Sequence, residues 1–346
     1  MGKPLISVVI TAFKRRKFLL RAAYSALHQT LARELYEVIV VKNFEDDRID
    51  RELNRLGVTN VRSNSIGLGA KVSEALEIAR GDVVSLLEDD DEFMPGKLEA
   101  VLKAFSSRPR LGLYRNSLLI VDESGRIAGR SAVREPIEAD CSARDPLRHM
   151  TLQGLLFNVS SMTVRRDVLD GDGVLRTLDL TVDSYCPLRA LMSGYRVLMD
   201  PRPLTAYRIH GAQAYGDVGS FESFRRSGAE IALRHLRDAR SILQAAEGSP
   251  CEYLARYLYV FHATGCMKVA GGLRIGRELR GSLDVSPRDL IAYFNVELLR
   301  PEPFRLAKLA LDMGSFALPG VIVGSLQRVP YALHLKNLSG RRARSA

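Results

Sequence analysis

A run of five acidic residues, Glu88 to Glu92, is the stretch whose residue types most plainly suggest chemistry. It follows the apolar stretch Val83–Leu87, which predicts a buried parallel strand. In open α/β sheets, ligands bind just beyond the carboxyl ends of such strands. Carboxylates this close together repel one another, so they stay ionised most easily around a cation or in water. Hard oxygen ligands suit Mg²⁺ or Mn²⁺, which commonly bind phosphate oxygens. The alternative is a solvated acidic turn before a helix that opens at Pro95.

The bulk composition bounds the class of protein. A chain of 346 residues predicts about two domains, and a net charge of +10 favours anionic partners such as nucleotides, nucleic acid or an acidic membrane face. From Gly219 onward, 19 Lys and Arg stand against 11 Asp and Glu, so most of the excess lies there. The four cysteines form no C-x-x-C pair, which predicts a reducing compartment. With neither a signal peptide nor a membrane span expected, we predict a cytoplasmic protein.

Strands alternate with helices over the first hundred residues, which predicts βαβ units and a parallel sheet. The loops after the strands would then line one edge of the sheet. That edge would carry Phe13, Lys14 and Arg15 after the first strand, Lys42 and Asn43 after the second, and the acidic run after the fourth. A ring that can stack on a base, together with cations and a metal that can bind phosphates, predicts a nucleotide diphosphate site. The elements expected are strands at 5–10, 37–41, 58–62 and 83–87, and helices at 18–27, 70–79 (ended by Gly81) and 95–105.

Two other nucleotide-binding classes are excluded by their motifs. Gly67-x-Gly69 lacks the rest of a G-x-G-x-x-G pattern and does not follow the first strand, so a dinucleotide-binding fold is not expected. The chain also has no G-x-x-x-x-G-K-[ST] phosphate-binding loop.

Six motifs occur in an order that points to one family. They are Ser7–Arg15, Ser25–Thr30, Glu37–Val41, Glu88–Glu99, Gly194–Tyr195 and Tyr207–Gly211. Over roughly residues 4 to 215 the chain resembles the family 2 glycosyltransferases. The resemblance implies a GT-A nucleotide-sugar-binding fold, which is an α/β fold with a mostly parallel central sheet flanked by helices, here with a C-terminal helical extension. It also implies an inverting, hexosyltransferase-type enzyme that uses a nucleotide diphosphate sugar and a divalent metal, Mn²⁺ or Mg²⁺.

The resemblance assigns roles to individual residues. Phe13 would stack on the base, with Thr11 and Asn43 at the nucleoside. Glu88 and Asp89 would approach the ribose and diphosphate, with Arg15 and Lys71 as cations at the diphosphate. Asp90 and Asp91 would hold the metal, and His210, in the Arg208-x-His210 pairing, would lie at the metal or diphosphate. A purely structural histidine is the alternative for His210.

The chain departs from the family pattern at two places. Lys42-Asn43 replaces an acidic pair that commonly reads a uracil edge, which leaves the nucleotide base open. Glu88 replaces the usual first Asp of the acidic motif.

Residues 106–218 are expected to form the acceptor side. They would include a strand at 111–121, a charged loop or lid from Arg126 to His149, and a strand at 157–166. The alignment to the family places the catalytic base, which must take a proton from the acceptor hydroxyl, at Asp183. Asp179 is the reserve candidate. An N-cap of a helix beginning near Ser184 is the alternative role for Asp183.

The last part of the chain predicts helices at 221–246, 251–267, 287–299 and 303–311. The apolar stretch 313–326 is followed by basic residues, which predicts a peripheral anchor on the inner face of the cell membrane and a lipid-linked or glycan acceptor. Packing on the catalytic domain is the alternative. We therefore divide the chain into a donor subdomain (1–105), an acceptor subdomain (106–218) and a basic helical region (219–346).

Two rival functions are carried forward. A sugar nucleotidyltransferase would need a Gly-rich loop after the first strand, but Thr11 to Arg15 contains no Gly. A degenerate glycosyltransferase-like scaffold at the membrane would explain Lys42-Asn43 and the apolar Val182, but not the intact Asp89-Asp90-Asp91 run. No aromatic-basic RNA-binding motif occurs, so no nucleic acid partner is expected.

Overall fold

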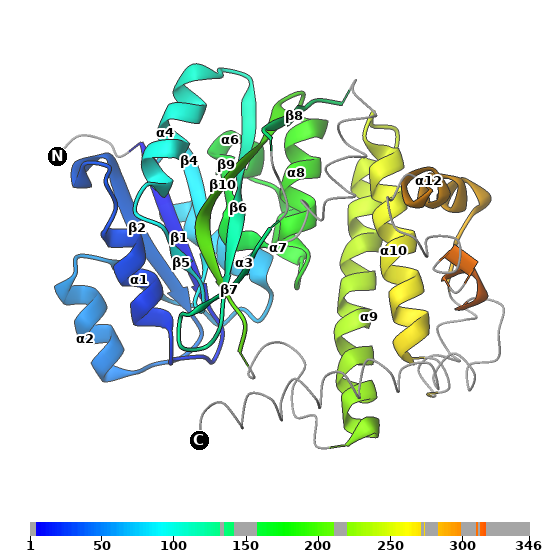
Figure 1. Cartoon of the computed structure of the whole chain (residues 1–346), viewed down its shortest axis with the longest axis horizontal. Coiled ribbons are helices and arrows are strands. Elements are labelled where there is room, and N and C mark those ends of the chain that lie inside the picture. The colour runs from blue at the N-terminus through cyan, green and yellow to red at the C-terminus, as the bar shows by residue number, and fades with distance from the viewer. Residues whose placement is uncertain are drawn as a thin grey trace. The chain divides into compact units, whose positions relative to one another are not determined.

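A computed structural model describes residues 5–131, 135–141, 158–210, 220–270, 273, 283–298, 309–310 and 312–315. The chain divides into two compact units, Met1–Ile209 with Gly248–Cys251, and His210–Glu247 with Glu252–Ala346. The first unit contains the β-sheet, and the second is helical (Figure 1). Within the described ranges, no helix combines the length and the apolar character needed to cross a membrane. The three-part division made from the sequence stays a prediction.

The strands of the first unit form one mixed sheet. Its order is β3-β2-β1-β4-β9-β6-β10-β5, with β7 paired to β6 and β8 paired to β10. Strand β1 is parallel to β2 and β4, β2 is parallel to β3, and β6 is parallel to β10. Strand β9 runs antiparallel to both β4 and β6. The bounds are β1 Ile6–Ala12, β2 Tyr36–Lys42, β3 Thr59–Arg62, β4 Val83–Glu88, β5 Glu92–Phe93, β6 Leu111–Val121, β7 Ile127–Arg130, β8 Ile137–Ala139, β9 Met162–Arg165 and β10 Arg196–Arg208.

Helices cover both faces of this sheet (Figure 1). Apolar residues of α1, α2 and α4 join Val8 and Ile10 of β1 in one core cluster. Successive strand residues point to opposite faces of the sheet. The other face of β1 and β2 is therefore available to α3, which packs on these strands, and α8 packs on β6 and β10. The bounds are α1 Leu19–Leu27, α2 Asp47–Arg55, α3 Leu68–Ile78, α4 Lys97–Ser107, α6 Arg166–Leu169, α7 Gly173–Thr177 and α8 Val182–Met192, with 3₁₀ turns η1 Arg33–Leu35 and η2 Val159–Ser161.

Two local expectations are wrong. Helix α3 ends at Ile78 with Ala79 as its C-cap, not at Gly81. Gly81 is instead required by packing, because a Cβ there would lie 2.4 Å from the Ser7 backbone nitrogen. The stretch from Arg126 to His149 is not simply a loop, because β7 and β8 lie within it and extend the sheet; residues 132–134 and 142–157 lie outside the described residues.

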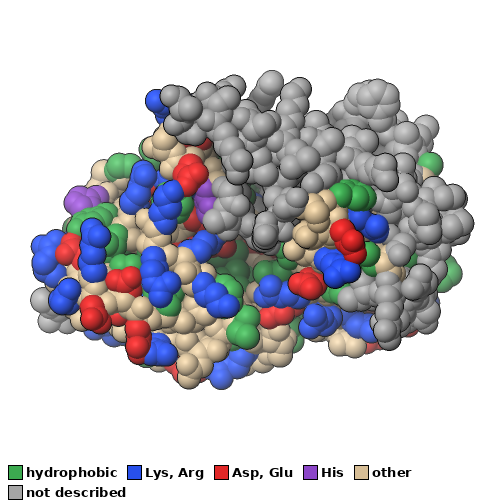
Figure 2. Space-filling view, turned by 90° about the horizontal axis from the view of Figure 1, so that it is seen from below, with side chains coloured by type: hydrophobic (Ala, Val, Ile, Leu, Met, Phe, Trp, Pro, Cys, Tyr) green, Lys and Arg blue, Asp and Glu red, His purple; other side chains and the backbone are tan. Residues whose placement is uncertain are grey.

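The second unit contains α9 Phe221–Ala246, α10 Glu252–Ala270 and α12 Pro287–Glu297. Helices α9 and α10 share a small core that includes Leu236, Tyr259 and Cys266. These three helices were expected from the sequence. Only 309–310 and 312–315 of the remaining predicted segments are described, so the apolar stretch 313–326 lies mostly outside the described residues. On the face shown in Figure 2, Lys and Arg side chains are interspersed with Asp and Glu over the coloured surface and do not gather in one continuous basic patch there.

Candidate donor and catalytic site

The carboxyl ends of β1, β2 and β4 are level with one another. Thr11 of β1 pairs in register with Val41 of β2 on one side and with Glu88 of β4 on the other. The residues that follow these strands therefore share one edge of the sheet, as expected. Two of the loops are tied together there, since the Lys14 backbone N–H donates to Asn43 Oδ1 at 2.8 Å.

Arg15 makes ion pairs with the acidic run. Its Nη2 lies 2.5 Å from Asp89 Oδ1, and its Nη1 lies 2.6 Å from Asp90 Oδ2. Burial lowers the pKa of Arg15, but the two carboxylates raise it above its ordinary value. The guanidinium is therefore always charged and supplies one positive charge to a cluster that carries several negative ones.

The acidic side chains are nevertheless undercompensated. Burial raises the pKa of Asp89 to about 6 and, with help from the charge of Asp90, that of Asp91 to about 7. Burial and the neighbouring carboxylates raise the pKa of Glu88 well above its ordinary value. Asp89 Oδ2 is buried and has no hydrogen-bond partner among the described residues. Full ionisation of this cluster therefore favours additional positive charge beside it.

Arg208, at the end of β10, holds the acidic run in place from the other side. Its side chain is 1% exposed, and its Nε donates to the Asp90 carbonyl at 3.0 Å. Its guanidinium also pairs with Glu92 and donates to the Asp122 and Glu123 carbonyls. Its backbone N–H donates to Asp91 Oδ1 at 2.9 Å.

Asn158 connects the acidic run to the candidate base. Its side-chain amide lies 3.4 Å from Asp91 Oδ2, and its backbone N–H donates to Asp183 Oδ2 at 2.8 Å. Its φ of 95° is unusual for a residue other than Gly, and its Oδ1 stabilises the turn by accepting from the Ser161 N–H at 2.9 Å. The acidic run and Asp183 therefore lie on either side of a single residue.

Asp183 stands in the first turn of α8. The helix begins at Val182 with Thr181 as its N-cap, so the interpretation of Asp183 as an N-cap is wrong. Burial raises the pKa of Asp183 above its ordinary value, which suits a carboxylate that must accept a proton. The reserve candidate Asp179 lies against the start of α3, where its carbonyl accepts from the Leu68 N–H at 3.0 Å.

Residues 7–170 match the family model described as glycosyl transferase family 2. The match covers just under half of the chain, and over these residues the chain is similar to glycosyl transferase family 2.

Known relatives agree with the family. An uncharacterized glycosyltransferase of Methanocaldococcus jannaschii is 24% identical over 133 residues, which cover 37% of this chain and 46% of the relative, so the match spans about half of that protein's length. S. aureus TarS 1-349, solved in complex with UDP-GlcNAc, has a TM-score of 0.56 at 16% identity, over 94% of this chain and 92% of TarS. The mannosyltransferase PcManGT from Pyrobaculum calidifontis, solved with GDP-Man and Mn²⁺, has a TM-score of 0.54 at 15% identity, over 95% and 88%. These likenesses confirm the GT-A fold.

Phe13 and Lys71, which the family resemblance also singled out, lie at or near this edge. The Phe13 ring is 38% exposed, and Lys71 Nζ lies 4.9 Å from its centroid. Lys71 is buried and donates to the Ile66 carbonyl at 2.9 Å. His210 is buried and begins the second compact unit. The roles of these residues stay predictions.

Lys42 does not line the site as expected. It is buried, its Nζ donates to the Phe44 carbonyl at 2.7 Å, and it pairs with Asp50 Oδ1 of α2 at 2.8 Å. Its charge therefore serves packing between β2 and α2, and Asn43 is the member of the pair that faces the loops of the site.

The chemistry of the carboxylates fits a divalent metal of the kind that family 2 glycosyltransferases use. The described carboxylates do not, however, form a complete set of metal ligands by themselves. They offer hard oxygen ligands, an unpartnered buried oxygen on Asp89, and raised pKa values that nearby positive charge would lower. Among the described residues, however, no set of three or more His, Cys, Asp or Glu side chains converges as ligands. A metal here would therefore need ligands supplied by the bound diphosphate or by water.

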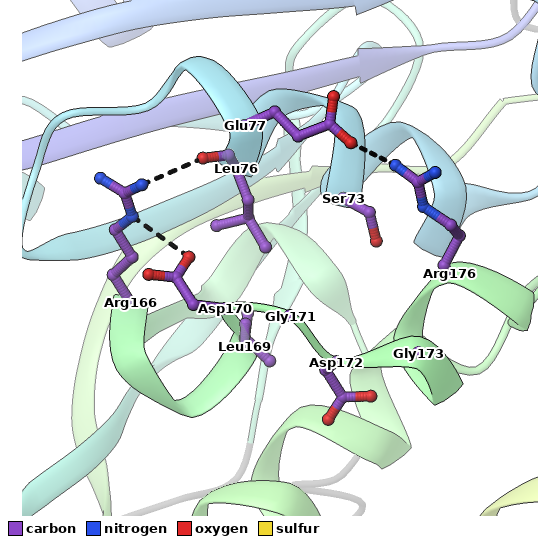
Figure 3. Close-up of a pocket in the computed structure, with 10 residues that line it drawn as sticks. All are labelled: Ser73, Leu76, Glu77, Arg166, Leu169, Asp170, Gly171, Asp172, Gly173 and Arg176. Carbon is purple, nitrogen blue, oxygen red and sulfur yellow. Dashed lines mark hydrogen bonds and ion pairs between the residues drawn. The ribbon is translucent and has the colours of Figure 1, made fainter.

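A large open pocket lies elsewhere in the first unit and has different chemistry. It measures about 400 Å³ and lies between α3 and the α6–α7 segment (Figure 3). Its charged side chains are directed at one another, Arg176 toward Glu77 and Arg166 toward Asp170. The Asp172 carboxylate accepts hydrogen bonds from the Tyr185 hydroxyl and from Arg189 Nε, both on α8. These pairs neutralise the charges that line the pocket.

Asn158, Ser160 and Arg115 were not predicted as site residues. The Ser160 hydroxyl accepts from the Glu88 N–H at 3.0 Å and hydrogen bonds to Asp91. The sequence signal at Asn158 was a glycosylation-type triplet, whereas the structure uses the residue as a turn and a bridge. Arg115 carries no local motif at all, and its position emerges only from the sheet.

Proposed function

We propose that this chain transfers a sugar from a nucleotide diphosphate sugar to an acceptor hydroxyl, with inversion at the anomeric carbon. The observation that carries the proposal is the Asn158 bridge between Asp91 and Asp183. A diphosphate held at the acidic run would present its sugar beside Asp183. The family match and the nucleotide-sugar complexes of TarS and PcManGT support this assignment.

The donor site is assembled from the loops at the sheet edge. The nucleoside lies at Thr11, Phe13 and Asn43, with the Phe13 ring against the base. Arg15 exchanges part of its contact with Asp89 and Asp90 for the diphosphate, with Lys71 nearby. Glu88 and Asp89 lie at the ribose and diphosphate.

The transfer step forms one bond and breaks another. The acceptor oxygen attacks the anomeric carbon, the bond from that carbon to the phosphate oxygen breaks, and its electron pair leaves with the diphosphate. Asp183 accepts the hydroxyl proton as the new bond forms. Asp90 and Asp91, with His210 as a further candidate, would hold a Mn²⁺ or Mg²⁺ ion, which when bound neutralises negative charge on the diphosphate.

The acceptor is proposed to be a glycan or a lipid-linked molecule. The excess of Lys and Arg after Gly219 supports contact with an anionic membrane surface, on the cytoplasmic face of the cell membrane.

The stereochemistry of donor hydrolysis tests the proposal without knowledge of the acceptor. UDP-GlcNAc or GDP-mannose, both α-linked, is incubated with the protein and Mn²⁺, and proton NMR follows the anomer that is released. We expect one donor to release its nucleoside diphosphate, and water in place of the acceptor to yield the β anomer first. Initial release of the α anomer would contradict inversion, and no turnover of any nucleotide sugar would contradict the proposed activity.

A further inference from the structure

Arg115 is a buried cation, and two of its three guanidinium nitrogens lack a hydrogen-bond partner among the described residues. It lies in β6, which is flanked by β9 and β10, and it is 3% exposed. Its Nε and Nη1 atoms are both buried and have no hydrogen-bond partner in the described part of the chain. Buried arginines are nearly always paired, and an unsatisfied charged donor is costly to bury. The proposed transfer of the hydroxyl proton to Asp183 does not by itself use the positive charge of Arg115.

The polar neighbours of Arg115 on β6 have partners of their own. Tyr114 donates its hydroxyl to Asp200 Oδ2 at 2.8 Å, and Asn116 accepts from the buried Lys97 ammonium. Arg115 itself pairs in register with Met162 of β9, directly after the η2 turn that Asn158 opens. The pairing therefore places Arg115 beside the strand residue that directly follows the turn, and the Asn158 N–H of that turn donates to Asp183.

Asp183 has one oxygen well bound and one available. Oδ2 accepts from the Asn158 N–H at 2.8 Å, whereas Oδ1 meets the Ser184 hydroxyl at 3.5 Å, the outer limit of a hydrogen bond. A guanidinium in direct contact with Asp183 would occupy the oxygen that must receive a proton. A cation held close by without that contact favours the ionised carboxylate and leaves the oxygen open.

We propose that Arg115 is a positioning residue that keeps Asp183 ionised, so that this carboxylate can accept the proton of the acceptor hydroxyl. The inference rests on the proposed function for its catalytic meaning.

The charged groups around Asp183 support this role of Arg115. Burial raises the pKa of Asp183; the Asn158 N–H hydrogen bond opposes this rise most, and the charge of Arg115 opposes it next. Burial lowers the pKa of Arg115 to about 9, so the guanidinium remains charged at neutral pH. Of the other ionisable groups, Cys186 on α8 is kept neutral because burial raises its pKa. The pKa of Lys97 on α4 is lowered strongly by burial and further by the charge of Arg115. Asp91 lies beyond Asn158.

A ¹³C NMR titration of the carboxylate tests the proposal directly. The whole protein is labelled at the aspartate carboxyl carbon, and the Asp183 resonance is identified by its absence from Asp183→Asn. In Arg115→Met, we expect the titration midpoint of Asp183 to move to higher pH by about 1 or more relative to wild type. Arg115→Lys, which keeps a cation, should restore most of the wild-type midpoint. In donor hydrolysis, the acid limb of the pH–rate profile should move in the same direction.

A matched control and three contrary results complete the test. Arg189→Met removes an arginine from the same helix as Asp183 that pairs with Asp172, and it should leave the Asp183 midpoint unchanged. The same midpoint in wild type and Arg115→Met would overturn the proposal. An unfolded Arg115→Met would also overturn it, because a guanidinium whose Nε and Nη1 lack partners in the described part of the chain should not be needed for folding. Failure of Arg115→Lys to restore the midpoint would show that the charge is not what matters.

The titration separates this inference from the proposed function. If the Asp183 midpoint differs between wild type and Arg115→Met as expected, but wild type turns over no nucleotide sugar, the proposed function alone is contradicted. Turnover with an unmoved midpoint would contradict the inference alone.

Discussion

Asp183→Asn is expected to lower the turnover of donor by about 10²- to 10⁴-fold, because general-base catalysis contributes a factor of that size. The amide has the same shape, so its oxygen can still accept the Asn158 N–H that holds Asp183 at 2.8 Å. It has no carboxylate to take a proton at neutral pH. Nucleotide binding should change little, since the acidic run that we propose holds the diphosphate is untouched. Release of nucleoside diphosphate under saturating donor measures the effect.

Asp179→Asn is the matched control, because Asp179 is the other carboxylate proposed for this role. It should retain turnover close to that of wild type. A dead Asp179→Asn beside an active Asp183→Asn would reverse the assignment of the base. Equal activity of both variants and wild type would remove the carboxylate base from the account.

Arg208→Met is expected to destabilise the protein by about 3–5 kcal/mol, the usual result when one partner of a buried ion pair is removed. Arg208 is 1% exposed, and its side chain is the partner of Glu92 and of the carbonyls of Asp90, Asp122 and Glu123. Methionine fills much of the volume but leaves these acceptors unsatisfied. Urea unfolding of wild type and variant at neutral pH measures the difference.

Arg226→Met controls for the loss of any arginine. Arg226 pairs with Glu222 on the exposed surface of α9, so its loss should cost less than about 1 kcal/mol. If Arg208→Met loses no more unfolding free energy than Arg226→Met, the buried contacts of Arg208 do not hold the acidic run.

The placement of the donor residues was predictable because it follows from sheet topology. Short apolar runs predict parallel strands, and parallel strands that are level at their carboxyl ends bring Thr11, Asn43 and Glu88 to one edge. Asp183 was predicted by alignment to the family, but its link to Asp91 was not. That link depends on Asn158, whose backbone takes up a positive φ that nothing in the sequence marks.

Buried charges were the part that could not be predicted. A lysine that ends a strand is ordinarily expected in solvent, yet Lys42 turns inward because Asp50 of α2 meets it. Arg115 stands in a strand whose alternate residues would normally face water, but β9 and β10 cover β6 on both edges and helices cover its faces. In both cases the burial comes from elements that pack against the strand, so only the folded chain reveals it.

Calorimetric titration tests the central claim, that the acidic run binds the diphosphate of a nucleotide sugar with the help of a divalent metal. UDP, GDP, UDP-GlcNAc and GDP-mannose are titrated into wild type and Asp91→Ala, with and without Mn²⁺. Asp170→Ala, which removes a partly exposed carboxylate in the pocket of Figure 3, is the control. We expect wild type and the control to bind one nucleotide series in a Mn²⁺-dependent manner, and Asp91→Ala to lose that binding. Equal binding by Asp91→Ala, or no nucleotide binding by wild type with or without Mn²⁺, would contradict the claim.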